Sequence, residues 1–188
     1  MNQGMEQEEL IKACKRGERP AQKQLYESYA PVMLGICYRY TTSLQEAEDV
    51  LQDAFVRVFN KLDQFRGEGD LGAWIRRIVV NCALNNLKRK HPKTSSWEDQ
   101  PETEHPPADD PMINIQAKEL ANLIRQLPDG YRIVFNLHAI EGYTHEEIGR
   151  MMGIRTVSSR SQYMRARVLL AQKLIALQEN IKSSAHGK

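Results

Sequence analysis

Residues 144–170 read THEEIGRMMGIRTVSSRSQYMRARVLL, and this segment specifies the architecture of the C-terminal half of the chain. Thr144, followed three residues later by Glu147, matches the capping box that begins a helix. Gly153 ends that short helix, and a long amphipathic segment follows. Gly149 provides a small residue inside the first helix, where a second helix would cross closely. The pattern predicts a helix-turn-helix.

The second helix of this motif has two distinct faces when its residues are placed at about 100° per residue. The inward face is small or apolar and consists of Ser159, Tyr163, Ala166 and Leu170. The outward face consists of Val157, Arg160, Ser161, Met164, Arg165 and Val168, with Gln162 and Arg167 on the flanks. Arginine bonds bidentately to guanine in the major groove, and serine bonds to bases or phosphate. The pattern therefore predicts DNA reading, with a solvated helix of a bundle as the alternative.

Helical periodicity extends over nearly all of the remaining chain, and no segment alternates like a strand. Ser43 and Glu46 form a second capping-box pattern, and Asp70 is placed to cap the helix after it. Pro31 falls inside an apolar-periodic run, where we expect a kink or a break. The predicted fold class is all-α, with helices over residues 6–16, from 20 onward, 43–62, 71–90, 113–127, 131–140, 144–152 and 156–181.

Periodicity stops between the two halves of the chain. Residues 91–111 hold five prolines, and six acidic residues with no Lys or Arg lie between Trp97 and Asp110. Such a composition is typical of a tether and not of a packed core. We expect two small helical domains, 1–92 and 113–182, joined by a flexible acidic linker over 93–112.

The net charge of +2 hides two basic segments. Residues 71–97 hold six Lys or Arg and no acid, and residues 148–178 again hold six and no acid. A run of like charge is often only a solvated face. Two such runs on helices in separate domains instead favour contact with a polyanion, because dispersed cations release its counterions.

Several other classes of protein find no support in the sequence. The cysteines Cys14, Cys37 and Cys82 are far apart and lie in apolar segments, so we expect buried, reduced thiols. The five histidines are dispersed, and no metal-ligand spacing, catalytic triad or phosphate-binding glycine loop is present. No signal peptide or membrane-spanning segment is visible. We expect a cytoplasmic protein with no cofactor, no metal and no catalytic residues.

Motifs in both halves resemble one protein family. The patterns LPxxYRxVF at 127–135, EGYTxEEI at 141–148 and SRSxxxRAR at 159–167 resemble the promoter-reading domain of sigma-70-type factors. In the N-terminal half, AEDVxQDxFxxxF at 47–59 and WIxRIxxNxALxxLxR at 74–89 are similar to the polymerase-binding and −10-reading domain of that family. The resemblance is closest to the short extracytoplasmic-function group of RNA polymerase sigma factors.

The resemblance implies roles for three sets of residues. The residues expected to contact the clamp of the largest subunit of core polymerase are Asp49, Gln52, Asp53, Val56 and Arg57. Melting and reading of −10 DNA fall on the loop and helix over 65–90, with Arg66, Arg76, Arg77, Asn81, Asn85, Lys88 and Arg89. Reading of the −35 duplex falls on the 156–170 helix, with Arg155, Ser158, Arg160, Ser161, Gln162, Met164, Arg165 and Arg167.

The resemblance also implies partners, and two other interpretations remain open. The partners are core RNA polymerase, including the flap of its second-largest subunit, promoter DNA and an anti-sigma factor. Val157-Ser158 and the small Ser159 depart from the family pattern at the start of the recognition helix. A stand-alone helix-turn-helix regulator would instead bind duplex DNA without polymerase. An enzyme is the second alternative, and turnover by the isolated chain would support it.

Overall fold

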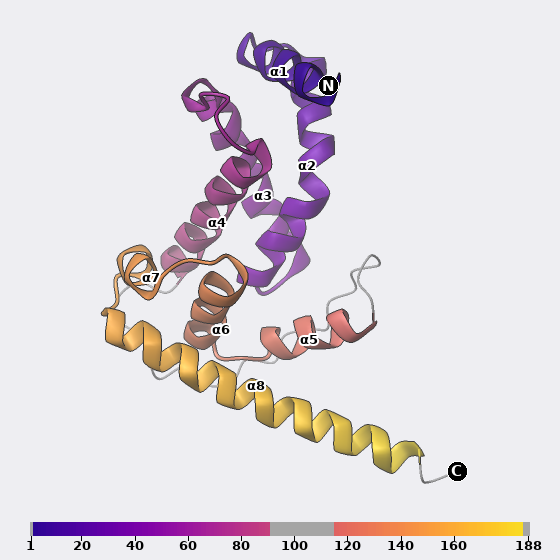
Figure 1. Cartoon of the computed structure of the whole chain (residues 1–188), viewed down its shortest axis with the longest axis vertical. Helices are drawn as coiled ribbons and strands as arrows, with labels where there is room; N and C mark the ends of the chain where they lie inside the picture. The colour runs from indigo at the N-terminus through magenta and orange to yellow at the C-terminus, as the bar shows by residue number, and fades with distance from the viewer. Residues whose placement is uncertain (1, 91–114, 186–188) are drawn as a thin grey trace. The chain divides into compact units, whose positions relative to one another are not determined.

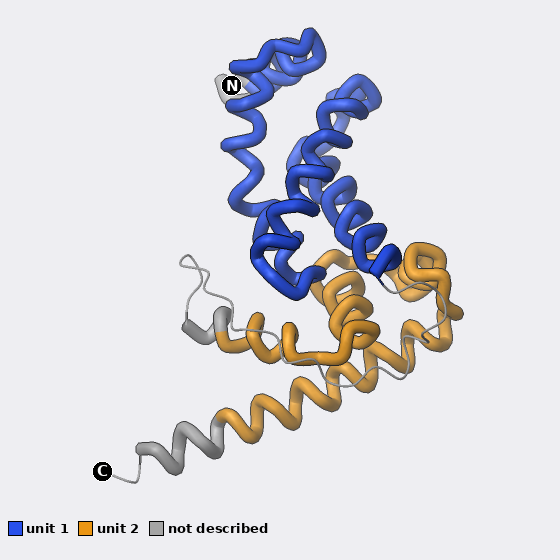
Figure 2. The backbone as a smooth tube through the Cα atoms, turned by 180° about the vertical axis from the view of Figure 1, so that it is seen from behind, with its two compact units in different colours: residues 1–91 blue, residues 92–188 orange. Residues whose placement is uncertain are grey.

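The computed structural model describes residues 2–90 and 115–185, and every regular element within these ranges is helical (Figure 1). The expected all-α fold class is confirmed. The chain divides into two compact units, residues 1–91 and 92–188 (Figure 2). The predicted linker over 93–112 lies outside the described residues. Within those residues, none of the helices has the length and apolar content needed to cross a membrane.

Unit 1 is built from helices α1 (Asn2–Lys15), α2 (Arg19–Tyr40), α3 (Leu44–Lys61) and α4 (Leu71–Lys90), with a short 3-10 helix, η1 (Leu62–Gln64). Helices α2, α3 and α4 pack against one another, and α1 packs on α2 and η1. Each helix contributes an apolar stripe at three- and four-residue spacing to the core. Fully buried members include Leu25, Cys37, Ala47, Val58, Ile75, Val79 and Ala83.

Helix α2 continues through Pro31, so the break allowed for at this residue does not occur. Proline lacks an N–H and removes one hydrogen bond of the helical ladder. Pro31 itself is exposed, whereas Ala30, Met33 and Ile36 beside it are buried. Burial of this apolar face against α3 and α4 maintains the helix across the proline.

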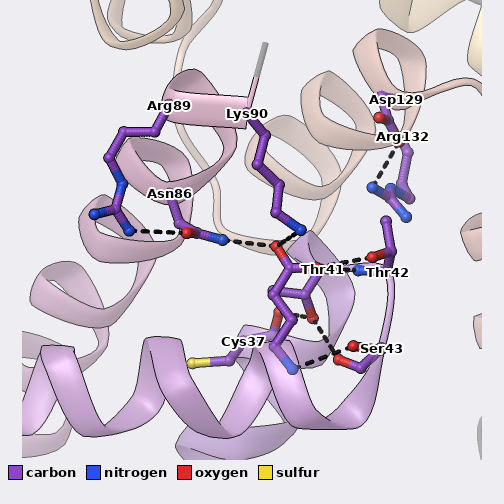
Figure 3. A network of polar contacts seen from close by, with 10 residues as sticks. Cys37, Thr41, Thr42, Ser43, Asn86, Arg89, Lys90, Asp129 and Arg132 are labelled. Carbon is purple, nitrogen blue, oxygen red and sulfur yellow. Dashed lines mark hydrogen bonds and ion pairs between the residues drawn. The ribbon is translucent and has the colours of Figure 1, made fainter.

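The start of α3 forms only half of the predicted capping box. The Ser43 hydroxyl accepts a hydrogen bond from the Glu46 N–H, as expected. The Glu46 carboxylate instead accepts from the N–H and hydroxyl of Thr42, at 3.1 and 2.8 Å. It also accepts from Asn86 of α4 at 2.6 Å and pairs with Lys90 at 2.9 Å (Figure 3). This side chain therefore ties the start of α3 to the end of α4.

The three cysteines, Cys14, Cys37 and Cys82, are all free and buried, as expected. Burial raises the pKa of each thiol, and that of Cys37 rises to about 12. The neutral thiols pack as small apolar groups in the core of unit 1.

Unit 2 contains α5 (Ile115–Arg125), α6 (Asp129–Phe135), the π-helix η2 (Asn136–Ile140), α7 (His145–Met152) and α8 (Thr156–Ala185). Figure 1 shows α6 and α7 lying along the N-terminal part of the long helix α8, and α5 also contacts α8. Its apolar core contains Leu123, Ile124, Leu127, Ala166 and Leu170.

The predicted helix-turn-helix is present in α7 and α8. Thr144 and Glu147 form both hydrogen bonds of the capping box at the start of α7. Gly153 ends α7 in the left-handed conformation, with φ of 72°, which glycine adopts without strain. A Cβ atom at Gly149 would lie 2.9 Å from the backbone oxygen of Ile154. The two helices can therefore cross as they do only because residue 149 has no side chain.

We expect Gly149→Ala to lower the free energy of unfolding by about 1–3 kcal/mol, because a backbone carbonyl cannot move aside as a flexible side chain can. Gly35→Ala is the matched control, since Gly35 lies inside α2 and a Cβ atom added to it would meet no atom within 4 Å. It should raise stability by up to about 1 kcal/mol through helix propensity. Urea denaturation followed by circular dichroism measures the free energy of unfolding of both variants. An equal change in that free energy for Gly149→Ala and Gly35→Ala would contradict the close crossing.

We expect Glu46→Gln to destabilise unit 1 by about 1–3 kcal/mol, because Asn86 and Lys90 lose a charged acceptor. Burial alone would raise the pKa of Glu46, but hydrogen bonds with Lys90 and Thr42 and the charge of Lys90 bring it below its usual 4.5. The contribution is thus present above pH 4.5 and is lost as pH falls through the lowered pKa.

Denaturation of the wild-type and Glu46→Gln chains across the acid range checks this difference. Glu27→Gln provides the control, because the Lys23–Glu27 pair is exposed at both side chains. Such a pair contributes little to stability. A Glu46→Gln chain as stable as the control at neutral pH would contradict the role of Glu46 as a tie between α3 and α4.

Candidate nucleic-acid interface

The outward face of α8 carries a cluster of basic and polar side chains. The exposed members of the predicted −35 set are Arg155, Arg160, Ser161, Met164, Arg165 and Arg167, and Ser158 is half-buried. Exposed apolar groups interleave with them, with Val157 at 68% and Val168 at 54% exposure. A face that combines guanidinium groups, hydroxyls and apolar groups can bind phosphates, base edges and thymine methyls.

Gln162 does not belong to this face, and its predicted contact with DNA is wrong for this structure. Its side chain is only 1% exposed. It lies three residues after Ser159 and four before Ala166, both fully buried. At ideal helical geometry, Gln162 lies close to the boundary between the inward and outward faces of α8. In the folded unit, the packing of α8 places it on the inward side.

Two arginines of α8 are held by aromatic side chains. The Arg165 guanidinium donates to the Tyr131 hydroxyl at 3.3 Å. The Arg167 guanidinium lies 5.9 Å from the centre of the Tyr163 ring, within the range of a cation–π interaction. Arg160 is exposed one turn nearer the start of the helix. The recognition face therefore combines arginines anchored by tyrosines with an arginine that extends toward solvent.

Beneath α8 lies a group of rings that no sequence pattern indicated. His138 of η2 and His145 of α7 stack with centroids 4.1 Å apart, and the Tyr163 ring packs against His138 at 4.7 Å. The His145 ring is also 3.0 Å from the Ser159 hydroxyl. Burial, together with His138 and Arg160, lowers the pKa of His145. The two histidines escape detection in the sequence because the turn between them interrupts helical periodicity.

Helix α4 displays a polar stripe along unit 1. Arg77, Asn81 and Asn85 are exposed and spaced four residues apart, so they follow one face. Lys88 and Arg89 continue it, whereas Arg76 is half-buried beside it. Amide groups flanked by cations can read unpaired bases while the cations hold phosphates.

The loop before α4 is held at both of its ends. The Phe65 ring packs against Trp74 at 5.5 Å, and the Phe65 carbonyl accepts from Lys15 of α1 at 3.0 Å. Asp70 caps α4 by accepting from the N–H groups of Gly72 and Ala73, as predicted. Arg66 is exposed within this loop. Trp74 is half-buried against Phe65.

The five residues predicted to contact polymerase form an exposed face of α3. Asp49, Gln52, Asp53, Val56 and Arg57 all point to solvent, and Val56 is 59% exposed.

The structure brings part of this polymerase set together with part of the −10 set. A groove of about 410 Å³ between α3 and α4 is lined by Asp53 and Arg57 on one side and by Asn85, Lys88 and Arg89 on the other. The polymerase set and the −10 set lie on different helices in the sequence, and only the packing of α3 against α4 brings them together. Within residues 2–90 and 115–185, no group of His, Cys, Asp and Glu is arranged to hold a metal ion.

Comparisons with known proteins agree with this geometry. Residues 25–92 match the family model of sigma-70 region 2, and residues 117–170 match that of sigma-70 region 4. The chain is 29% identical over 180 residues to the RNA polymerase sigma-H factor of Pseudomonas aeruginosa, covering 89% of this chain and 93% of that protein. It is 28% identical over 176 residues to the ECF RNA polymerase sigma factor SigW of Bacillus subtilis, covering 87% and 94%.

A solved structure has the same fold. It is the sigma factor RpoE of Bartonella quintana in complex with the anti-sigma factor NepR, with a TM-score of 0.50 and 20% identity over 81% of this chain and 95% of that one. The two family models lie in the N-terminal and C-terminal halves, in the order that the sequence motifs indicate. The chain therefore belongs to the sigma-70 family, in its extracytoplasmic-function group, and is an RNA polymerase sigma factor that serves transcription initiation.

Proposed function

We propose that this sigma factor divides promoter reading between its two halves, with residues 1–92 binding core polymerase and −10 DNA and residues 113–182 reading −35 DNA. Residues 93–112 are the proposed acidic link between them. The observation that carries the proposal is the exposed basic face of α8, displayed by a helix-turn-helix whose glycine crossing and capping box are both formed.

In unit 2, the N-terminal half of α8 enters the major groove of the −35 element. Arg160 and Ser161 lie on its exposed face and are the proposed base readers. Arg165 and Arg167, which are braced by tyrosines, are the proposed phosphate contacts. Arg155, Ser158 and Met164 complete the proposed contact surface.

In unit 1, the stripe of α4 and the loop before it bind the −10 strand. Asn81 and Asn85 are the proposed readers of an unstacked base, because amides offer both donors and acceptors. Arg66, Arg76, Arg77, Lys88 and Arg89 surround them and are the proposed phosphate contacts.

The exposed face of α3, with Asp49, Gln52, Asp53, Val56 and Arg57, docks on the clamp of the largest polymerase subunit. The region 4 half contacts the flap of the second-largest subunit. An anti-sigma factor is the proposed regulator, a class of partner supported by the complex of the relative from Bartonella quintana. The chain works in the cytoplasm with polymerase and promoter DNA, and it contributes binding rather than catalysis of its own.

Run-off transcription tests the division of promoter reading. Core polymerase is incubated with genomic fragments, with and without the chain, and the 5′ ends of the transcripts are mapped. We expect new start sites that share two sequence elements upstream of the start. Start sites that share only one element would contradict the proposed roles of the two halves.

Arg160→Ala tests base reading by α8. If Arg160 bonds to a base, the variant should lose about 1–3 kcal/mol of holoenzyme binding to the cognate −35 duplex and little on a scrambled duplex. Arg19→Ala is the control, because Arg19 is an exposed arginine at the start of α2, outside all three proposed contact sets. An equal loss on both duplexes would show that Arg160 contacts phosphate.

A further inference from the structure

The aromatic group beneath α8 has a defined architecture, and we call His138, His145, Ser159 and Tyr163 the histidine platform. The two imidazoles stack at 4.1 Å with planes 24° apart. Tyr163 packs edge-on against His138, lies 5.7 Å from His145, and stacks on Phe135 of α6 at 5.9 Å. Residues from η2, α7 and α8 therefore meet at one point, where the recognition helix begins.

Two hydrogen bonds fix the orientation of the imidazoles. The Nδ1 atom of His138 is 2.9 Å from the Tyr143 carbonyl oxygen. A carbonyl can only accept, so this Nδ1 carries a hydrogen. The Nδ1 atom of His145 is 3.0 Å from the Ser159 hydroxyl, which is fully buried. The first residue of α7 is thus joined to the first turn of α8.

We propose that the histidine platform positions the DNA-reading half of α8, and that discrimination of the −35 sequence declines when His145 takes up a proton. The proposal rests on the proposed function of α8. Ser159 directly precedes Arg160, and Tyr163 directly precedes Met164. Any rotation of α8 on the platform would therefore swing its exposed face relative to the groove. His138, His145 and Ser159 are positioning residues, since they act through the helix and not on DNA.

The charges around the platform determine the direction of the pH effect. The titratable groups that face His145 are His138 from η2 and Arg160 and Tyr163 from α8. On α7 itself, Glu146 and Glu147 follow in sequence, and Thr144 holds the Glu147 carboxylate. A proton on His145 therefore places positive charge beside Arg160, and like charges repel.

The pH range follows from the same contacts. Burial, His138 and Arg160 lower the pKa of His145 from its usual 6.5, so the folded state favours the neutral ring. The contribution of the stack is complete above pH 6.5 and is lost as pH falls through the lowered pKa. An added proton also attracts phosphate, but it does so on every DNA sequence alike. The ratio of affinities for cognate and scrambled duplexes removes this common effect.

The experiment uses holoenzyme assembled from core polymerase and the full chain. Fluorescent duplexes carry either a −35 element selected from a random library by wild-type holoenzyme or a scrambled element of equal length. The ratio of their affinities is measured between about pH 5.5 and 8, the range in which imidazoles titrate. We expect the wild-type ratio to fall severalfold toward the acid end.

Four variants separate positioning from simple stability. At neutral pH, His145→Leu and Ser159→Val should each lower the ratio roughly tenfold, because each removes the hydrogen bond that joins α7 to α8, and His145→Leu also leaves the buried Ser159 hydroxyl without this partner. The double variant replaces the hydrogen bond by apolar packing and should recover most of the ratio. His145→Asn places an amide where Nδ1 lies and should retain the ratio. Both the double variant and His145→Asn should also show a flatter pH profile.

Two results would overturn the proposal. One is a wild-type ratio that does not change with pH, and the other is a double variant no better than its parents. Thermal melting of each variant, followed by circular dichroism, identifies any that do not fold, and the wild-type pH profile does not depend on them. Arg160→Ala at pH 8, where imidazoles are neutral, tests the role of α8 separately. An unchanged ratio for that variant would refute base reading by Arg160. The wild-type pH profile would still test whether the histidine platform positions α8.

Discussion

The close crossing of α7 and α8 at Gly149 governs the arrangement of the recognition unit. With 2.9 Å between a Cβ position and the Ile154 carbonyl, no side chain can occupy residue 149 while the crossing is kept. The crossing brings the start of α7 against the first turn of α8, so His145 meets Ser159. It also selects which residues of α8 face outward, because an inward face must pack where the helices meet. The helix-turn-helix that displays the basic surface thus depends on a close backbone contact.

Unit 1 relies on a different kind of interaction, in which polar groups join helices at their ends. Glu46 receives hydrogen bonds from its own helix start and from the end of α4. Along the adjoining groove, Asp53 of α3 faces Lys88 and Arg89 of α4. Phosphate is attracted by these cations and repelled by the carboxylate. This distribution of charge is consistent with the proposed roles, in which α4 binds nucleic acid and the exposed face of α3 binds a protein partner.

Local patterns identified several elements of the fold because their causes lie within one turn of the chain. Asp70 caps α4 through N–H groups two and three residues away, and Thr144 with Glu147 closes a capping box over the same distance. Gly153 adopts the left-handed conformation that the end of a helix favours. Cys14, Cys37 and Cys82 are buried, as their apolar surroundings indicate. Family resemblance, carried by motifs in both halves, supplied the step from DNA binding to a sigma factor.

The all-α class, the caps formed by Asp70 and Thr144, the glycine crossing and the outward arginines could be predicted from the amino-acid sequence, because each depends on neighbours within a few residues. Tertiary packing was needed to establish that α2 continues through Pro31, that Glu46 bonds to α4, and that Gln162 turns inward. It was also needed to bring His138, His145 and Tyr163 together from three elements. These features could not be predicted from the sequence, because burial and hydrogen-bond partners in a packed unit are determined by residues distant in sequence. A helical period fixes the angle of a side chain but does not specify what that side chain meets.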